Sequence, residues 1–218
     1  MLKIENVDIF GWEASIRGLR SPMNSWDKSD SGYMTEYDEG GFEAEFYKIS
    51  QNDLKLMQSL VKAGSDHSKF MRMINVTLDI TAPLYWWKEF DTYKVGTVRN
   101  SCSTMHKITE KEFTLDDFSH EHLIVASLNS LNRTIDDLNS CRDGYLNENI
   151  SKNPEWKKEV WWQIIQLLPS SYNQRATAQL NYAVLRNMYH SRKNHKLDEW
   201  KDFCKWIETL PYSELITM

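Results

Sequence analysis

The sequence lacks any long apolar run. No stretch of its 218 residues approaches the length of about 20 apolar residues that a membrane-spanning helix requires. The first residues, MLKIENVDIFGWEAS, contain no hydrophobic segment of the kind found in secretory signals. We therefore expect neither a membrane partner nor secretion.

Cysteine and positive charge are also scarce. The three cysteines, Cys102, Cys141 and Cys204, are too widely spaced for a zinc motif or a disulfide framework. This pattern predicts a cytoplasmic protein with reduced thiols and no metal. The net charge is -5 and the pI about 5.7, whereas general nucleic-acid binders are basic. We therefore do not expect nucleic acid as a partner.

Aromatic residues, in contrast, are abundant. They make up 12% of the chain, which contains nine tryptophans, and hydrophobic residues reach 41%. A chain of this length and composition can bury a substantial core. Because no repeat, low-complexity tract or linker interrupts it, we predict a single domain over residues 1–218.

Alternating and helical periodicities predict the first elements. Apolar residues alternate over 2–10 and more clearly over 74–80, which indicates two strands, and 42–49 is predicted as another strand. A helix is predicted to begin at Asp53. The segment 21–41 is rich in Ser, Asp and Gly and is predicted to be a mobile loop.

The later part of the chain is predicted to be mostly helical. Pro83 can occupy the first position of a helix in which Trp87, Phe90 and Lys94 share one face. Helical spacing also predicts helices over 115–140, 155–168, 174–192 and 197–209. The sum is an α+β domain in which helices outweigh strands.

Residues 67–106, HSKFMRMINVTLDITAPLYWWKEFDTYKVGTVRNSCSTMH, contain a His, a strand, a Pro-led helix and a polar segment in that order. This stretch resembles the flavin-dependent thymidylate synthase (ThyX) family. In that family a His leads into a V-x-F-T-F-like strand, and a Pro-led helix ends in R-H-R-x-x-S-x-[NQ]-E-x-S-x-R. His67, Thr77 and Pro83 fit this framework without gaps.

A second stretch, LPSSYNQRATAQLNYAVLRNMYHSR (168–192), resembles the same family. There the family has L-P-x-S, an Arg, N-x-R-x-L-x-N and then L-R. The matching positions are Leu168, Pro169, Ser171, Arg175, Asn181, Leu185, Asn187 and Arg192. Residues 14–21 resemble the family's first helix more weakly. Residues 195–218 lack the family pattern and are predicted as a divergent C-terminal helix.

The resemblance implies a ThyX-like fold, with a small, mostly antiparallel sheet packed with several long helices. It also implies a homotetramer, FAD as a cofactor, and a nucleotide-like ligand such as dUMP. In the family, positions matching His67, Asn181 and Asn187 face the flavin, and the position matching Arg192 holds the dUMP phosphate. These four residues are our candidate cofactor and substrate ligands.

The signature that carries the family's chemistry is eroded. Its R-H-R positions are Thr92, Tyr93 and Lys94 here, and its [NQ]-E pair is Arg99 and Asn100. Other family positions are occupied by Glu89, Thr97, Cys102, Thr104, Ile165 and Ala183. Because several of these changes remove a charge, a phosphate would be held less well than in the family.

Three signature positions keep useful chemistry. Lys94 is a candidate for cofactor binding and for catalysis, and Arg99 is a candidate substrate ligand. Cys102 is a candidate for substrate binding and catalysis. A reactive thiol requires a cationic neighbour that lowers its pKa, which Arg99 or His106 can supply. An inert, half-buried cysteine is the alternative.

The candidate ligands also have structural explanations. Asn181 and Asn187 can cap backbone groups, Arg192 can pair with a helix C-terminus, and His67 can be a surface residue. If 174–192 is one helix, a single face of it carries Asn181, Leu185, Met188 and Arg192.

Three functions follow from this evidence. The first is a ThyX-like nucleotide-binding protein whose dUMP methylation is lost or altered. The second is an active flavin-dependent transferase that methylates dUMP or a related pyrimidine nucleotide. The third is a non-catalytic scaffold or partner-binding protein.

Overall fold

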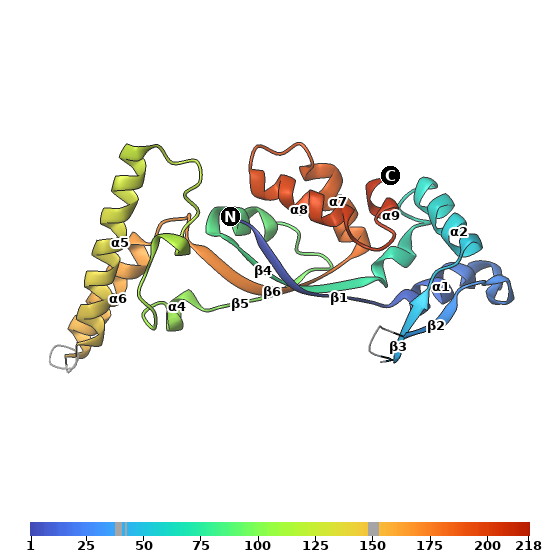
Figure 1. Ribbon diagram of the computed structural model, residues 1–218, viewed down its shortest axis with the longest axis horizontal. Helices are drawn as coiled ribbons and strands as arrows, with labels where there is room; N and C mark the ends of the chain where they lie inside the picture. The colour runs from blue at the N-terminus through green and yellow to red at the C-terminus, as the bar shows by residue number, and fades with distance from the viewer. Residues whose placement is uncertain (38–40, 42, 148–152) are drawn as a thin grey trace. The chain divides into compact units, whose positions relative to one another are not determined.

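The computed structural model describes residues 1–37, 41, 43–147 and 153–218 (Figure 1). Its strands are β1 Lys3–Phe10, β2 Gly32–Tyr37, β3 Glu43–Lys48, β4 Asn75–Pro83, β5 Val98–Ser101 and β6 Asn173–Asn181. Its α-helices are α1 Trp12–Arg20, α2 Gln51–Lys62, α3 Leu84–Phe90, α4 Thr104–Lys107, α5 Val125–Leu146, α6 Pro154–Leu167, α7 Tyr182–Arg192, α8 Asp198–Glu208 and α9 Glu214–Thr217. Short 3-10 helices are η1 Ser21–Met23, η2 Trp26–Lys28, η3 Lys69–Arg72 and η4 Leu115–Asp117.

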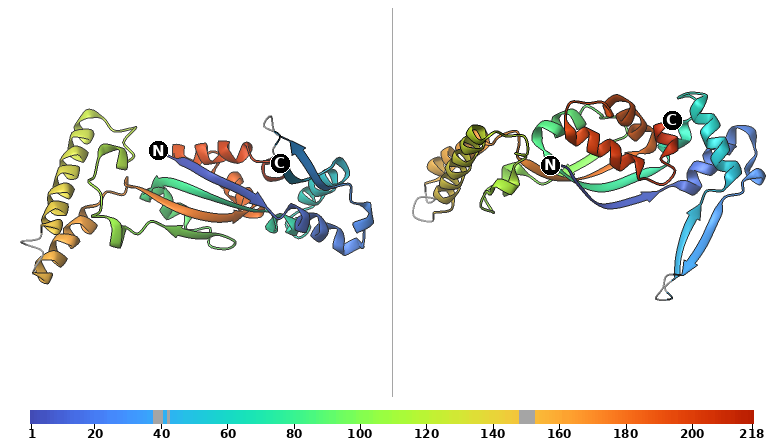
Figure 2. Two further views of the ribbon diagram at one scale, coloured as in Figure 1. Left: turned by 60° about the horizontal axis from the view of Figure 1, so that its bottom comes forward. Right: turned by 45° about the horizontal axis from the view of Figure 1, so that its top comes forward.

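The strands form a four-stranded sheet of order β1-β4-β6-β5 and a separate two-stranded ribbon. In the ribbon, β2 and β3 pair antiparallel, with Gly32 opposite Lys48 and Tyr37 opposite Glu43 (Figure 2). Together with the excess of helices, these sheets confirm the predicted α+β class.

The contacts of the chain gather into two compact units. The first comprises Met1–Glu5, Asp79–Thr92 and Arg99–Thr177. The second comprises Asn6–Leu78, Tyr93–Val98 and Ala178–Met218. The strands β4 and β6 contribute residues to both units. Over the described ranges, no helix is long and apolar enough to cross a membrane.

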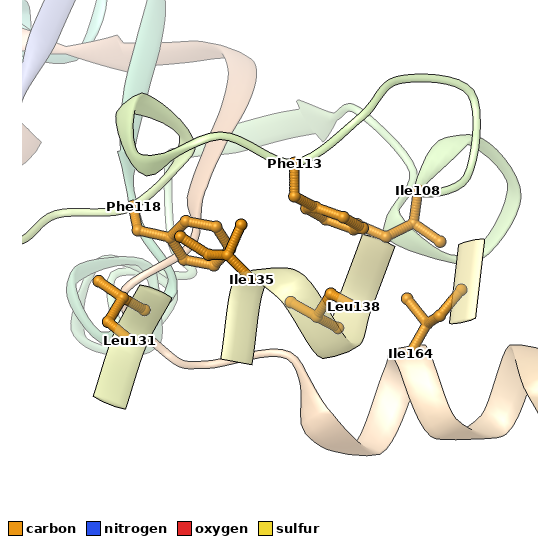
Figure 3. Close-up of a cluster of buried hydrophobic side chains, with 7 residues drawn as sticks. All are labelled: Ile108, Phe113, Phe118, Leu131, Ile135, Leu138 and Ile164. Carbon is orange, nitrogen blue, oxygen red and sulfur yellow. The ribbon is translucent and has the colours of Figure 1, made fainter. Parts of the chain in front are cut away.

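The core of the first unit forms where α5 and α6 lie side by side (Figure 1). Leu131, Ile135 and Leu138 recur at helical spacing along α5 and cluster with Ile164 of α6 (Figure 3). The segment before α5 closes the cluster with Ile108, Phe113 and Phe118. Full burial of each such side chain contributes about 1.5–3 kcal/mol, which explains why this helix pair is stable.

In the second unit, α7 packs against both α8 and α9. Tyr182, Leu185 and Met188 of α7 are fully buried, as is Trp200 of α8. This arrangement leaves the opposite side of α7 as the side that can meet a ligand.

Several predicted elements are confirmed with shifts of one to three residues at their ends. These are β1, β3, α2, β4, α6 and α8. In β4, α2 and α8 the period of the segment matches a buried face, whereas β1 and β3 contain no buried residue.

The predicted helix over 174–192 is wrong in its first half. Residues Asn173–Asn181 form β6, and the helix begins only at Tyr182. The segment contains Ala and Gln, which favour helices in isolation. In the structure, however, its residues are buried in alternation, since β6 lies between β4 and β5 in the sheet. Pairing in the sheet therefore overrides local propensity.

The segment 21–41 holds more regular structure than the loop we predict, because it contains η1, η2 and β2. The buried carboxylate of Asp53 anchors it. This group accepts hydrogen bonds from Arg20 Nε at 2.6 Å and from the Ser29 and Ser31 hydroxyls at 2.7 Å each. These partners lie 22 to 33 positions from Asp53, so local composition does not reveal them. Residues 38–40, and residue 42 of the predicted second strand, lie outside the described residues.

Two helix boundaries also differ from the predictions. The helix α3 begins after Pro83 and ends at Phe90, so Lys94 does not share its face. The Thr92 hydroxyl donates to the Glu89 carbonyl at 2.7 Å, which competes with continuation of the helix. In the predicted helix over 115–140, a capping box starts the single turn η4, the chain then leaves the helical conformation, and α5 begins only at Val125.

Candidate functional site

Asn181 caps the N-terminus of α7. Its Oδ1 accepts a hydrogen bond from the Val184 backbone N–H at 3.0 Å, and only 9% of the residue is exposed. Gly96 packs directly on this cap with a φ of +80°. A Cβ on Gly96 would lie 2.9 Å from Asn181 Nδ2, so the position requires glycine. Asn181 therefore caps the helix, and its contact with a flavin stays a prediction.

Arg192, at the end of α7, is enclosed by aromatic rings of the same unit. Its Nε donates to the Tyr93 hydroxyl at 2.9 Å. Its guanidinium lies 5.0 Å from the centroid of the Trp200 ring and 5.6 Å from that of Tyr93. The guanidinium is thus already engaged in cation–π and hydrogen-bond contacts, which makes it less available to a phosphate.

The helical face predicted to carry Asn181, Leu185, Met188 and Arg192 is instead largely core. Leu185 and Met188 are both 0% exposed, and Asn181 belongs to β6 rather than to the helix. Asn187 lies on the other side of α7.

That other side of α7 borders a cavity of about 330 Å³, which we call the α7 cavity. Ala183, Arg186, Asn187 and His190 line it from α7, at the i, i+3, i+4, i+7 spacing of one helical face. The facing wall comes from the end of α2 and from η3, with Ser65, Ser68 and Arg72 as its polar members. The cavity therefore collects hydroxyl, amide, imidazole and guanidinium groups.

The α7 cavity is electropositive. Arg72, Arg186 and His190 line it, and no Asp or Glu does. Burial lowers the pKa of Arg186 from its usual value, but an arginine stays charged at neutral pH. Within the described part of the chain, the Arg72 side chain makes no hydrogen bond or ion pair. Uncompensated positive charge of this kind favours an anion.

Two of these side chains are held by the C-terminal segment. Arg186 Nη1 donates to the carbonyl of Ile216 at 3.1 Å and to the main-chain oxygen of Met218. His190 Nε2 lies 3.1 Å from the same Ile216 carbonyl. Because a carbonyl only accepts, His190 Nε2 is the protonated nitrogen, which leaves Nδ1 as the other hydrogen-bonding group of the ring.

Sequence reasoning identified Asn187 in this cavity and missed Arg72, Arg186 and His190. The spacing of Ala183, Arg186, Asn187 and His190 is a signal that points to them once α7 is known to begin at Tyr182. Ala183 stands at the position of a family arginine, and its small side chain leaves the cavity open.

His67 does not line the α7 cavity. It is exposed in the turn after α2, where its backbone N–H donates to the Gly64 carbonyl at 3.1 Å. Lys94 is likewise exposed, in the segment between α3 and β5. Their assignment as cofactor ligands stays a prediction.

Arg99, in the first unit, is held by side chains of the same unit. Its guanidinium donates to Asp91 Oδ2 at 2.6 Å and to Gln174 Oε1 at 2.5 Å. It also stacks 3.9 Å from the centroid of the Trp87 ring. These partners fix the position of the Arg99 guanidinium, while its buried Nε has no hydrogen-bond partner among the described residues.

Cys102 is exposed and borders a second cavity of about 210 Å³, which we call the Cys102 cavity. Burial raises the pKa of Tyr172, in the same cavity, to about 12, so this hydroxyl stays protonated. The cations that line the cavity are already paired: Lys107 with Glu110, Lys111 with Asp117, and Arg175 with Asp79. The charge that would activate the thiol as a nucleophile is therefore largely neutralised.

Over the residues that the structure describes, no group of three or more His, Cys, Asp or Glu side chains could hold a metal ion.

The fold as a whole is similar to a known class of fold, that of the flavin-dependent thymidylate synthases. Two solved structures of ThyX from Helicobacter pylori, each with FAD and dUMP, carry the likeness. One has a TM-score of 0.67 and 15% identity, over 98% of this chain and 97% of the other. The second has a TM-score of 0.65 and 15% identity, over 100% and 97%. No protein-family profile and no curated protein matches this chain.

These structures confirm the resemblance found in residues 67–106 and 168–192 as a likeness of fold. The protein has a divergent ThyX-like fold.

Proposed function

We propose that this protein binds a nucleotide-like, phosphate-bearing small molecule in the α7 cavity and does not methylate dUMP. The observation that carries the proposal is the lining of this cavity, which contains Arg72, Arg186 and His190 and no carboxylate. The likeness to ThyX structures that contain FAD and dUMP supports a nucleotide as the ligand class.

Each polar group of the α7 cavity has a distinct role in this proposal. Arg72 is exposed, and its planar guanidinium can bind two phosphate oxygens at once. The amide of Asn187 can bind an adjoining hydroxyl or carbonyl. Arg186 contributes positive charge and His190 a hydrogen-bonding ring nitrogen, from positions set by Ile216.

The chemistry of the cavity fits part of FAD, which the fold implies as cofactor. A pyrophosphate would meet two arginines and an amide there. The volume of about 330 Å³ lies at the small end of the range for ligand pockets, about 300–1,000 Å³. It therefore suits a phosphate with its adjoining sugar better than a whole dinucleotide. A flavin, when bound, would supply redox chemistry.

Loss of dUMP methylation follows from the signature residues. Catalysis of this kind depends on charges placed where the reacting groups develop charge. Here Thr92 and Tyr93 replace two charged or titratable family residues. Of the remaining cations, Arg99 and Arg192 are bound to Asp91, Gln174 and Tyr93, whereas Lys94 is exposed.

The test begins with the visible absorption spectrum of the purified protein, followed by calorimetric titration with dUMP, FAD and inorganic phosphate. We expect no thymidylate synthesis and saturable binding of a phosphate-bearing ligand. Arg72→Ala should weaken that binding by about tenfold or more, since hydrogen bonds to charged groups contribute about 1.5–3 kcal/mol.

Lys69→Ala is the matched control, because Lys69 lies in the same short helix η3 but outside the cavity. Equal losses of ligand affinity in the two variants would show that only the overall charge of η3 matters, and would contradict the proposal. Bound flavin together with tritium release from labelled dUMP would replace the proposal by an active flavin-dependent transferase. If none of these ligands binds, the non-catalytic scaffold or partner-binding protein would be the function that is favoured.

A further inference from the structure

The second unit contains another cavity, of about 840 Å³, which shares no lining residue with the α7 cavity. It lies where β1 leads into α1, beside the β2–β3 ribbon and the turn at Pro211 and Tyr212. We call it the aromatic cavity, because its lining includes Phe10, Trp12, Tyr33, Phe46, Tyr47 and Tyr212. Its volume falls within the range of about 300–1,000 Å³ typical of ligand sites.

One wall of the aromatic cavity is fixed to the core. The Trp12 ring lies 5.2 Å from the ring of Tyr182 at an interplanar angle of 84°. It lies 5.3 Å from the ring of Tyr212 at 69°. Tyr182 is fully buried, and its hydroxyl donates to the Pro211 carbonyl at 2.6 Å. Trp12 is therefore held in place before any ligand arrives, which limits the entropy lost on binding.

The ribbon forms the facing wall. Tyr33 and Tyr47 are cross-strand partners, with ring centroids 5.2 Å apart and an interplanar angle of 83°. The Tyr33 hydroxyl donates to Glu13 Oε2 at 3.1 Å, which ties the ribbon to α1. Even so, 57% of Tyr33 is exposed, so its ring remains open to a stacking partner.

Two unusual backbone positions shape this cavity. Gly11 has a φ of +93°, and a Cβ there would lie 2.0 Å from the Met73 carbonyl oxygen. Tyr212 has a φ of +52°, which is strained for a bulky residue. Its hydroxyl accepts from the Ile49 N–H at 3.1 Å and donates to the Ile49 carbonyl at 3.3 Å. Strain of this kind persists where the surrounding structure over-determines it, often at binding sites.

The polar groups of the aromatic cavity define the ligand. Glu13 and Glu45 bring two carboxylates and Arg17 one cation, so the lining carries a net negative charge and disfavours phosphate. Carboxylates accept hydrogen bonds, and aromatic walls favour stacking with a flat ring.

We propose that the aromatic cavity binds a planar nucleobase with N–H donors along one edge. The base stacks between the Trp12 and Tyr33 walls, and a rim carboxylate accepts its N–H groups. Guanine is the purine with two adjacent donors of this kind, so it is the preferred base. This site is independent of the proposed phosphate site in the α7 cavity.

Titration with guanosine, inosine and adenosine tests the site, because nucleosides carry no phosphate. We expect guanosine to bind most tightly, measured by calorimetry. Tyr33→Ala should weaken binding by about tenfold, as stacking contributes about 1–3 kcal/mol per base. Glu13→Gln should reduce the preference for guanosine over adenosine, because the amide offers fewer acceptors.

Tyr37→Ala is the matched control, since Tyr37 lies on the same face of β2, is 70% exposed and does not line the cavity. Trp12→Ala is read only together with its melting temperature, because Trp12 also packs on the core. Failure of all three nucleosides to bind, or equal losses in Tyr33→Ala and Tyr37→Ala, would overturn the proposal. Arg72→Ala should leave guanosine binding unchanged, which separates this test from that of the α7 cavity.

Discussion

The α7 cavity and the Cys102 cavity both contain clustered cations, but the two sets of cations differ in their partners. Around the Cys102 cavity, every lining Lys and Arg is paired with a carboxylate. In the α7 cavity, the Arg72 side chain has no carboxylate partner among the described residues, and Arg186 is held by the main-chain oxygens of Ile216 and Met218. The cations of the Cys102 cavity are neutralised by the protein's own carboxylates, whereas those of the α7 cavity can attract a ligand.

The number of cations in a sequence motif therefore does not show how well a protein binds an anionic ligand. Arg99 and Arg192 lie at or beside family positions, yet each is bound by neighbouring side chains. Arg72 lies outside the matched positions and has no such partner. Substitution of cations that are bound by neighbouring side chains should therefore lower stability. Substitution of a cation without such partners should lower ligand affinity.

The largest effect is expected at the buried pair of Arg20 and Asp53, which are 5% and 0% exposed. Asp53→Ala leaves the guanidinium buried without its carboxylate, which should cost about 3–5 kcal/mol in the free energy of unfolding. Urea denaturation measures the loss. Asp27→Ala, at an exposed site in η2, is the control and should change stability by less than about 0.5 kcal/mol. Similar losses for both variants would refute the assignment.

Acid should weaken the same pair. Burial by itself raises the pKa of the Asp53 carboxyl, but hydrogen bonds from Ser29, Ser31 and Arg20 outweigh it and hold the pKa below its usual value. The stabilisation is therefore fully present above the unfolded-state pKa of about 3.9 and is lost as the pH falls through the lower folded-state pKa. Below about pH 4, unfolding free energies should fall more steeply for the wild type than for Asp53→Asn. Parallel curves would contradict this linkage.

Arg192→Ala should lower stability without lowering affinity. It removes a hydrogen bond to Tyr93 and contacts with two rings, together worth about 2 kcal/mol. Thermal unfolding and ligand titration should be measured on the same preparation, with the exposed Lys196→Ala as control. A large drop in affinity for a phosphate-bearing ligand, with stability unchanged, would return Arg192 to the role of its family counterpart.

Substitution of the two asparagines at the start and middle of α7 should have opposite effects on stability and on ligand affinity. Asn181→Ala removes the cap of α7 and should destabilise the fold by about 1 kcal/mol with little effect on binding. Asn187→Ala should leave stability nearly unchanged and weaken binding by about fivefold, the value of one neutral hydrogen bond. Loss of affinity in Asn181→Ala alone would reverse this assignment.

Cys102→Ser should have the smallest effect. The cations nearest to this exposed thiol are paired, so little nucleophilic chemistry depends on it. We expect a stability change within about 0.5 kcal/mol and unchanged ligand affinity. Rapid, selective alkylation of Cys102 at neutral pH would show instead that the thiol is activated.

Elements whose own period matches their burial could be predicted from sequence. The strand β4 alternates cleanly between buried and partly exposed residues, and α8 buries one helical face. The strand β6 could not, because its Ala and Gln residues favour a helix locally while its strand state depends on sheet neighbours distant in sequence.

The site was harder to predict than the fold. Asn187 was found through the family resemblance, but the roles of Arg186 and His190 depend on where α7 begins, and a shift of the helix start changes which side chains are thought to share a face. The engagement of Arg192 by Tyr93 joins residues 99 positions apart, which no local pattern encodes.

The carbonyl of Ile216 anchors two side chains of the α7 cavity although it does not line the cavity itself. An arginine or histidine that is free to change rotamer loses conformational entropy when it closes on a ligand. Here the C-terminal segment bears that loss during folding, so the binding groups are preorganised. Removing only Thr217 and Met218, which leaves the buried Leu215 and Ile216 in place, should therefore slow association and reduce affinity with the cavity lining unaltered, and NMR side-chain relaxation of Arg186 would report the added motion.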